Sequence, residues 1–218
     1  MLRKNYLFLF MFLLLAAACK KHSVSYKTLT LQPTDNPTEV HIYGNNTGNE
    51  GSTVLSPEID GAAWTQNGDT VGVRAALQFD LSSIPGSAVI DSSRLTLYSN
   101  PTPINGNMVD ANYGTDNTLL IEQITTAWNA SLVRWTNQPT ATSTDEVVIP
   151  STTQNFLDLP NIDVTSMVSN MVKNNANYGF LIRLQTETAY NSRIFCSSKY
   201  SDTTKHPKIA VWYHTVTN

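Results

Sequence analysis

Short segments in which apolar and polar residues alternate recur along most of the chain. A period of two places every second side chain on the same face, which is typical of a strand with one buried side. Residues 74–81 (RAALQFDL) alternate in this way, and residues 92–99 (SSRLTLYS) do so again after a proline-glycine turn. We therefore expect these two segments to form adjacent strands.

Other segments have the same character and are separated by turn residues. The further strand candidates are KTLTLQP, TLLIEQI, SLVRW, EVVIP, NFLDL, GFLIRLQTE, SRIFCSS and PKIAVWYH. About ten short strands at such close spacing are typical of an all-β antiparallel sandwich or barrel. The pattern therefore predicts a single all-β domain.

One segment departs from this pattern. In DVTSMVSNMVKNN the valine and methionine residues recur at helical spacing, which predicts a short helix near residues 164–174. Asp163 or Thr165 can cap its first turn, because a side-chain oxygen there accepts an otherwise unpaired backbone N–H.

Long polar stretches separate several of the predicted elements. We expect loops at residues 35–52, 58–70, 100–117 and 139–145. Loops of this size on a rigid sandwich usually carry the binding residues of the protein.

The amino-acid composition is that of a folded domain, and the net charge limits the kinds of molecule that the domain could bind. Of the 218 residues, 41% are hydrophobic and 14% charged, which is enough apolar material for a core. The length favours one domain over two. The formal net charge is −3, and a mildly acidic exported domain is a poor candidate for binding nucleic acid.

The first residues have the features of an export signal. Arg3 and Lys4 precede an apolar run that is too short to span a membrane comfortably, and three alanines then lead to Cys19. This order resembles a bacterial lipoprotein signal, which implies cleavage before Cys19 and lipid attachment to its sulfur. The expected division of the chain is a signal peptide over residues 1–18, a lipid-anchored tether over 19–27 and the sandwich domain over 28–218.

A lipid on Cys19 implies a place in the cell envelope, joined to a membrane through the N-terminus. The resemblance points to the outer membrane of a Gram-negative bacterium, and the sequence leaves open which side of that membrane the domain faces. If Cys19 carries lipid, Cys196 is the one remaining cysteine. A disulfide framework is then excluded, and the core must hold the fold together without one.

Three stretches taken in order resemble the DNRLRE domain family, a carbohydrate-binding module of exported microbial proteins. They are RAALQFDLSSIPGSAVIDSSRLTLYS, then AWNASLVRWTNQPTA, then IDVTSMVSNMVKNNANYGFLIRL with SRIFCSSKY and HPKIAVWY. The resemblance implies a jelly-roll β-sandwich that binds extracellular polysaccharide, with acidic, alginate-like glycans among the ligands. Two departures concern ligand identity: SSKY lacks a charge common in the family, and the first loop is longer and more polar than usual.

Aromatic residues in the expected loops are the first candidates for carbohydrate binding. An aromatic ring can stack on the face of a sugar ring. Trp64 leads, because no periodic pattern explains a tryptophan in the turn-rich segment DGAAWTQNGD, and Tyr43 and Tyr113 follow. Trp128 is a further candidate, whereas Trp135 has neighbours that alternate like a strand and is interpreted as core.

The charged side chains between positions 74 and 99 have two possible interpretations. Asp80 ends a strand before two serines, where a carboxylate accepts the N–H groups of the following turn. Arg74 and Arg94 lie on outward positions, where pairing with a carboxylate across strands is common. We favour this structural interpretation. The functional alternative is that both arginines clamp the carboxylate of a uronic acid with parallel hydrogen bonds.

The segment DANYGTDN has the composition of a calcium loop. Asp110, Asn112 and Asp116 would supply oxygen ligands at its first, third and seventh positions. The glycine at the fifth position and Ile121 at the twelfth exclude an EF-hand. A structural calcium ion held by these loop oxygens is the one cofactor that the sequence leaves open.

Signatures of catalysis are missing from the sequence. The histidines have no zinc-like spacing, and the chain contains no nucleophile elbow, no H-E-x-x-H and no phosphate loop. Glu50, Glu58, Asp60 and Asp69 could pair for glycoside hydrolysis, but their turn-rich setting favours solvated loop charges.

The sequence thus predicts a non-catalytic polysaccharide-binding module on a lipid-anchored exported protein. Loop aromatics and polar or arginine contacts would hold the glycan. The first alternative is a structural or adhesive surface lipoprotein that binds a protein or matrix partner. A polysaccharide lyase or hydrolase is the weaker alternative, because the sandwich is almost the whole mature chain.

Overall fold

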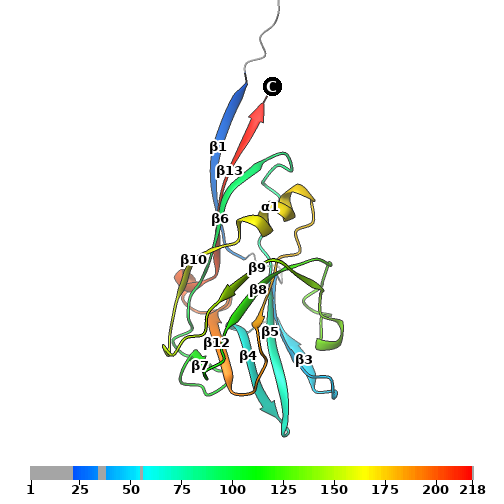
Figure 1. Cartoon of the computed structure of the whole chain (residues 1–218), viewed down its shortest axis with the longest axis vertical. Helices are drawn as coiled ribbons and strands as arrows, with labels where there is room; N and C mark the ends of the chain where they lie inside the picture. The colour runs from blue at the N-terminus through cyan, green and yellow to red at the C-terminus, as the bar shows by residue number, and fades with distance from the viewer. Residues whose placement is uncertain (1–21, 34–37, 55, 218) are drawn as a thin grey trace, which may run out of the picture.

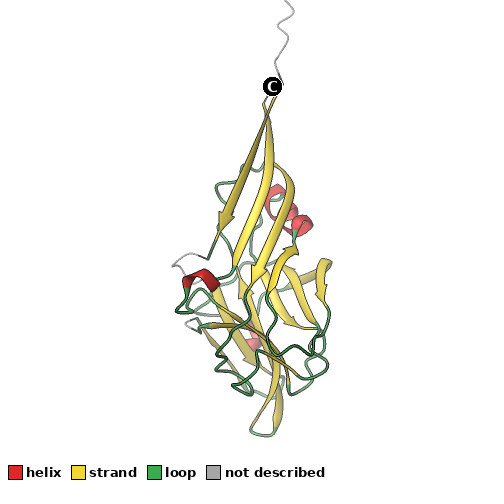
Figure 2. Ribbon diagram, turned by 90° about the vertical axis from the view of Figure 1, so that its left-hand side faces the viewer, coloured by secondary structure: helices red, strands yellow, loops and turns green. Residues whose placement is uncertain are grey.

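The computed structural model describes residues 22–33, 38–54 and 56–217. In this part of the chain, thirteen strands, one α-helix and two short 3-10 helices form two antiparallel sheets that face one another (Figures 1 and 2). The expected all-β sandwich with one short helix is confirmed.

The smaller sheet contains four strands. Their order is β1 (Ser23–Leu31), β13 (Lys208–Thr217), β6 (Val89–Leu97) and β10 (Leu159–Asp163). β1 pairs with β13 from its first residue, since Ser23 lies opposite Thr217. Residues 23–27, expected to be part of a tether, therefore belong to a strand, and His22 precedes it. Residues 19–21 lie outside the described part of the chain.

The larger sheet contains nine strands and carries the loops considered below. The main path runs β7 (Asn112–Tyr113), β12 (Asn191–Cys196), β4 (Glu58–Gln66), β5 (Asp69–Leu77), β11 (Phe180–Leu184), β8 (Leu119–Ile124) and β9 (Ala141–Ile149). β2 (Glu39–Gly44) pairs with β5 and with β3 (Glu50–Thr53). The 3-10 helices are η1 (Trp135–Asn137) and η2 (Thr203–Lys205).

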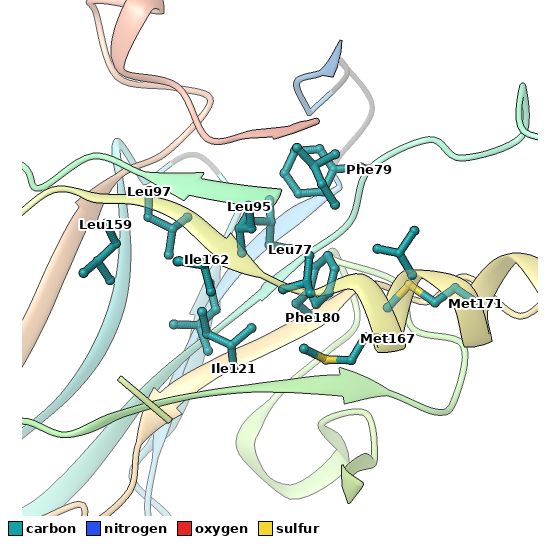
Figure 3. Close-up of a cluster of buried hydrophobic side chains, with 14 of the residues drawn as sticks. Leu77, Phe79, Leu95, Leu97, Ile121, Leu159, Ile162, Met167, Met171 and Phe180 are labelled. Atoms are coloured by element: carbon teal, nitrogen blue, oxygen red, sulfur yellow. The ribbon is translucent and has the colours of Figure 1, made fainter. Parts of the chain in front are cut away.

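The main core lies between the two sheets and is closed at one end by α1 (Thr165–Lys173) (Figure 3). Leu95 and Leu97 of β6 face Phe180 of β11 and Ile121 of β8, while Met167 and Met171 of the helix complete the cluster. These alternating and helically spaced apolar residues are the ones whose pattern predicted strands and a helix. The Asp163 carboxylate accepts the Thr165 backbone N–H at 3.1 Å, so Asp163 supplies a hydrogen-bond acceptor at the start of the helix.

Several segments differ from the expectation. The expected loops at residues 35–52 and 58–70 contain β2, β3 and β4, and residues 131–135 (SLVRW) form turns and the start of η1 instead of a strand. The segments around residues 74–81 and 92–99 are consecutive strands, β5 and β6, but they belong to different sheets. Alternation shows which residues of a strand share a face, but not which sheet the strand joins. In β5 both faces are buried, since Ala75 belongs to the main core and Ala76 to a second hydrophobic cluster.

The molecule is elongated, and its two ends differ. β1, β13 and β6 run together to the end where β1 begins, whereas β7 and the turn between β4 and β5 lie toward the opposite end (Figure 1). The start of the described chain and the loops around β7 are therefore well separated.

Candidate functional site

Three aromatic side chains from distant parts of the sequence meet beside β7. The ring of Trp64 on β4 stacks on that of Tyr113 on β7, with centroids 5.9 Å apart and planes 27° apart. Tyr190, just before β12, meets Trp64 edge-on at 6.0 Å and 70°. Tyr113 is 41% exposed and Tyr190 54% exposed, so a ligand can reach both. We name these three residues the aromatic platform.

Local contacts hold the platform in position. Tyr190 OH and Thr65 Oγ1 are hydrogen-bonded at 3.1 Å, and the Tyr190 N–H donates to Ala63 O at 2.7 Å. Tyr190 has φ +66°, a left-handed conformation that costs a non-glycine residue energy and often occurs at functional sites. Gly106 lies so close to Trp64 that a Cβ there would be 1.9 Å from Cζ2 of the indole. The tyrosines therefore rest on a fixed support.

An open cavity of about 580 Å³ adjoins the platform. Tyr113 and Tyr190 are part of its wall, and the other polar groups are hydroxyls, amides and one carboxylate. They belong to Asp110, Asn112, Thr115, Thr152, Thr153, Asn155 and Asn191. Such a mixture can donate hydrogen bonds to sugar hydroxyls and accept them.

Hydrogen bonds within the walls shape this cavity in advance. The Asn155 amide donates to Asp110 Oδ1 at 2.7 Å, and the Asn112 amide donates to Gln154 O at 2.9 Å. Gly114 has φ +78°, and a Cβ there would lie 2.1 Å from Asn191 Oδ1. A glycine at this position therefore allows the loop after β7 to approach β12 closely.

A family model for carbohydrate-binding module family 96 matches residues 60–211, which is more than half of the chain. The chain belongs to this family. A search of curated proteins found no match. The family supports a carbohydrate-binding role, so this part of the sequence prediction is confirmed. The matched residues include the platform and most of the main core; β1 and the ends of β4 and β13 lie outside the match.

Trp128 and Trp135 lie away from the platform in this module. Trp128 Nε1 donates to Tyr178 O at 2.8 Å, and its ring packs on the smaller hydrophobic cluster, so these contacts hold Trp128 in place. It also lines a second cavity of about 390 Å³ together with the exposed Leu132. Trp135 packs on the same cluster but stands at the start of a 3-10 helix, not in a strand.

Arg74 is fully engaged by other side chains. Its Nε and Nη2 donate to the two carboxylate oxygens of Glu187 at 2.7 and 2.8 Å, and Nη1 donates to Gln138 Oε1 at 2.9 Å. The guanidinium also lies 4.2 Å from the centroid of the Trp135 ring. The clamp that a uronic acid would need is thus occupied by Glu187.

The remaining candidates, Arg94, Tyr43 and Asp80, have other structural surroundings. Arg94 forms an ion pair with Asp163, and hydrogen bonds from Arg94 and Thr165 lower the pKa of Asp163 to about 2. Tyr43 lies on β2 instead of in a loop, half-buried against Gly51 of β3. Asp80 accepts the Ser82 N–H at 2.9 Å, as expected for a turn.

Glu58 and Asp60 are not solvated loop charges. Both lie on β4, exposed by 2% and 0%. Glu58 accepts hydrogen bonds from the Ile104 N–H and the Asn105 amide, each at 2.7 Å, and the same amide nitrogen lies 2.7 Å from Asp60 Oδ2. Burial and the neighbouring Asp60 charge raise the pKa of Glu58 to about 7. We name Glu58, Asp60 and His41 the buried acidic network, because His41 Nε2 lies 3.1 Å from Asp60 Oδ2.

The three calcium candidates have different surroundings. Asp110 and Asn112 line the cavity, whereas Asp116 is exposed and is not part of its wall. Asn112 Oδ1 is buried without a hydrogen-bond partner among the described protein atoms. Within that same part of the chain, no three His, Cys, Asp or Glu side chains gather closely enough to hold a metal ion.

The sequence argument missed several site residues, namely Tyr190, Thr115, Thr152, Thr153, Asn155 and Asn191. A tyrosine in the turn-rich segment TETAYNS was the signal for Tyr190, by the same reasoning that singled out Trp64. Residues 152–155 have no comparable signal, because they lie in the connection between β9 and β10 and reach β7 only through hydrogen bonds from Asn112 to Asn155 O and Gln154 O. As for membrane segments, the structure contains, among the described residues, no helix that is long and apolar enough to cross a bilayer.

Proposed function

We propose that this module holds a polysaccharide across the aromatic platform and the adjoining cavity without breaking its bonds. The observation that carries the proposal is the pair Tyr113 and Tyr190, exposed yet held by Trp64, beside a wall of hydroxyl and amide groups. The apolar face of a sugar ring packs on such rings, and the surrounding polar groups bind its hydroxyls.

The arrangement of carboxylates supports a non-catalytic role. Glycoside hydrolysis usually requires two carboxyl groups about 5–10 Å apart on either side of the sugar bond. Asp110 is the one carboxylate among the described residues of the cavity wall. Glu58 and Asp60 form a close pair with a raised pKa on Glu58, but the cavity beside Glu58 measures about 10 Å³. That volume admits about one water molecule and no sugar ring.

Anchoring by a lipid on Cys19 completes the proposal. Cys19 lies outside the described residues, but β1 begins at Ser23, four positions later. The platform lies toward the other end of the molecule (Figure 1). An anchor at Cys19 would therefore leave the platform pointing away from the membrane, free to meet polysaccharide. The export signal over residues 1–18 and an outer-membrane location belong to the same proposal.

Acidic glycans, such as alginate, are the charged alternative within this proposal. They would need a cationic partner for the uronate carboxylate. Arg74 is bound to Glu187 and Arg94 to Asp163, so neither arginine supports this alternative without first breaking an ion pair.

An adhesive or structural role is the second candidate. The loop before β7 exposes three large apolar side chains, Ile104, Met108 and Val109. An apolar surface of this kind favours a protein partner. In that case the loop, and not the tyrosines, would carry the affinity.

Substitution of the tyrosines tests the proposal. Tyr113→Ala and Tyr190→Ala are each expected to weaken retention on the bound polysaccharide at least tenfold, about 1.4 kcal/mol, with no shortening of the chains. Tyr26→Ala is the matched control, because Tyr26 is an exposed tyrosine on β1, toward the opposite end. Unchanged retention in both platform variants would refute the site, and new reducing ends would show catalysis. Cys19→Ser should release the exported chain from the membrane fraction if Cys19 carries the lipid.

A further inference from the structure

β1, β13 and β6 run together as a ribbon toward the end of the molecule where β1 begins (Figures 1 and 2). Five large apolar side chains of this ribbon are exposed, and we name them the ribbon face: Val24, Tyr26, Val89, Trp212 and Val216. Directly paired residues point to the same side of a sheet. Val24 pairs with Val216, whereas Tyr26 and Val89 both lie opposite His214. Trp212 is two positions from His214 and therefore lies on the same side.

The ribbon face is the outer side of the smaller sheet. The residues of β13 that alternate with it, Ile209, Val211 and Tyr213, belong to the main core. Tyr26 is 74% exposed, and its ring lies against that of His214 with centroids 5.3 Å apart. Several exposed apolar side chains that adjoin in this way are typical of an interaction surface.

The charges of the smaller sheet suit an anionic partner, although the whole chain has a net charge of −3. The four strands contain three basic residues and two acidic ones: Lys27, Arg94, Lys208, Asp91 and Asp163. Each carboxylate has a basic partner, since Asp91 Oδ1 lies 2.8 Å from His214 Nδ1 and Asp163 pairs with Arg94. Of the lysines, Lys208 lies near the ring of Tyr98, and Lys27 is on the other side of the ribbon from the ribbon face.

The chain before β1 brings this surface close to the expected lipid. Ser23 follows Cys19 by four positions, and four extended residues span at most about 14 Å. Two of the intervening residues are Lys20 and Lys21. Lysines next to an anchor are attracted to anionic lipid headgroups, and tyrosine and tryptophan favour the interface between membrane and water.

We propose that the ribbon face lies on a lipid bilayer that carries anionic headgroups. Its tyrosine, tryptophan and valines enter the headgroup region, and the lysines on and before the ribbon meet the lipid phosphates. The inference goes beyond the proposed function, and it rests on the lipid anchor that is part of that function.

This contact sets the orientation of the module. The core separates the two sheets, so the outer side of the smaller sheet faces away from the larger sheet. Trp64 and Tyr113 of the platform lie on β4 and β7, which belong to the larger sheet. With the ribbon face on the bilayer, the platform is on the side of the sandwich away from the membrane.

Quenching of tryptophan fluorescence by brominated lipids tests the contact, because bromine on an acyl chain quenches only rings that reach the bilayer. The exported chain is purified from the membrane fraction in detergent. It is then returned to vesicles of phosphatidylethanolamine and phosphatidylglycerol, with or without bromine on the acyl chains. Trp212 is one of four tryptophans, so bromine is expected to remove about a quarter of the emission. Trp212→Phe should abolish most of that loss.

Serine substitutions identify the surface responsible. Tyr26→Ser and Val216→Ser are each expected to reduce the quenching at least twofold, because membrane binding scales with the apolar area that is buried. Leu132→Ser is the matched control and should leave the quenching unchanged. Leu132 is also an exposed apolar residue, but it lies in the turn before η1, which is hydrogen-bonded to β3 of the larger sheet. Melting curves show whether each variant is folded.

Flotation of the vesicles separates this inference from the anchor. A chain that floats with the vesicles without bromine quenching overturns the inference and leaves the anchor in place. A chain that does not float overturns both. Quenching that Trp212→Phe leaves unchanged, or equal effects of Tyr26→Ser and Leu132→Ser, would place the contact elsewhere and overturn the inference. Cross-linked dimers that Tyr26→Ser abolishes, in the absence of quenching, would instead assign the ribbon face to a second copy of the chain.

Discussion

Raising the pH from about 5 to about 8 is expected to weaken the fold, because Glu58, Glu39 and His41 hold their protons more strongly in the folded chain than in the unfolded chain. Burial and the Asp60 charge raise the pKa of Glu58 from 4.5 to about 7. Burial also raises the pKa of Glu39, despite hydrogen bonds from Ser198. Burial alone would lower the pKa of His41, but the carboxylates of Asp60 and Glu58 outweigh it and raise that pKa above 6.5.

The sign is the same for all three groups. Each has a higher pKa in the folded chain than in the unfolded chain, so the folded chain binds more protons in this range. Their stabilising contribution is present below the unfolded pKa and is lost as the pH rises through the folded pKa. For Glu58 the difference between 4.5 and about 7 corresponds to about 3 kcal/mol, at about 1.4 kcal/mol for each pH unit.

Groups with lowered pKa values act in a different window. Hydrogen bonds lower the pKa of Asp163 to about 2, and that of Asp80 is also lowered. Their contribution is present above the unfolded pKa of 3.8 and is lost as the pH falls below it. Between about pH 5 and pH 8 they stay ionised in both states, so the slope there belongs to the buried groups.

Urea unfolding at a series of pH values measures this effect. With a slope near 3 kcal/mol per molar urea, a loss of about 3 kcal/mol moves the midpoint down by about 1 M. Asp60→Asn removes the negative charge beside Glu58 but keeps an oxygen that can accept the hydrogen bond from Asn105. The new amide nitrogen would take the place of Asp60 Oδ1, which is buried without a partner among the described atoms. This variant should reduce the pH dependence without abolishing it, because desolvation of Glu58 remains.

Asp116→Asn serves as the control, since Asp116 is exposed. A midpoint that stays constant or rises between about pH 5 and pH 8 would refute the reasoning. So would an Asp60→Asn variant with the pH dependence of the unchanged chain.

Three further perturbations follow from the contacts. Arg193→Met removes a buried charge, two of whose nitrogens have no hydrogen-bond partner among the described atoms. The melting temperature of this variant should therefore rise, or fall by no more than about 5 °C. A larger fall would show that the guanidinium has a partner. Arg74→Ala breaks the pair with Glu187 and should cost about 2 kcal/mol of unfolding free energy while leaving glycan retention unchanged, and lost retention in a folded variant would restore Arg74 as a glycan clamp. Adding a calcium chelator should change neither the melting temperature nor retention, because Asp116 does not join Asp110 in the cavity wall; a drop in either quantity would instead establish the calcium site.

The local sequence pattern was sufficient to predict elements whose buried residues can be recognised from neighbours in the same strand or helix. β8, β11 and β13 alternate or are continuously apolar, β9 and β12 each contain an apolar run, and α1 has helical spacing, so these elements could be predicted from neighbouring residues. The first half of β9 was nevertheless missed, because its residues 141–145 fall in a segment expected to be a loop. The pattern failed for β4, because Glu58 and Asp60 read as loop charges. Their burial depends on Asn100, Asn105 and His41, which come from other segments.

The sequence by itself determined the fold class, the short helix and two residues of the platform, Trp64 and Tyr113, which stood out as aromatics without a periodic reason. The tertiary structure alone decided that these rings meet, that Tyr190 joins them and that residues 152–155 supply the facing wall. It also decided that Arg74 and Arg94 are paired with carboxylates. The physical reason is that periodicity reports which side of a segment is buried, whereas a binding site depends on which distant segments pair, and antiparallel pairing between remote strands leaves no local mark in the sequence.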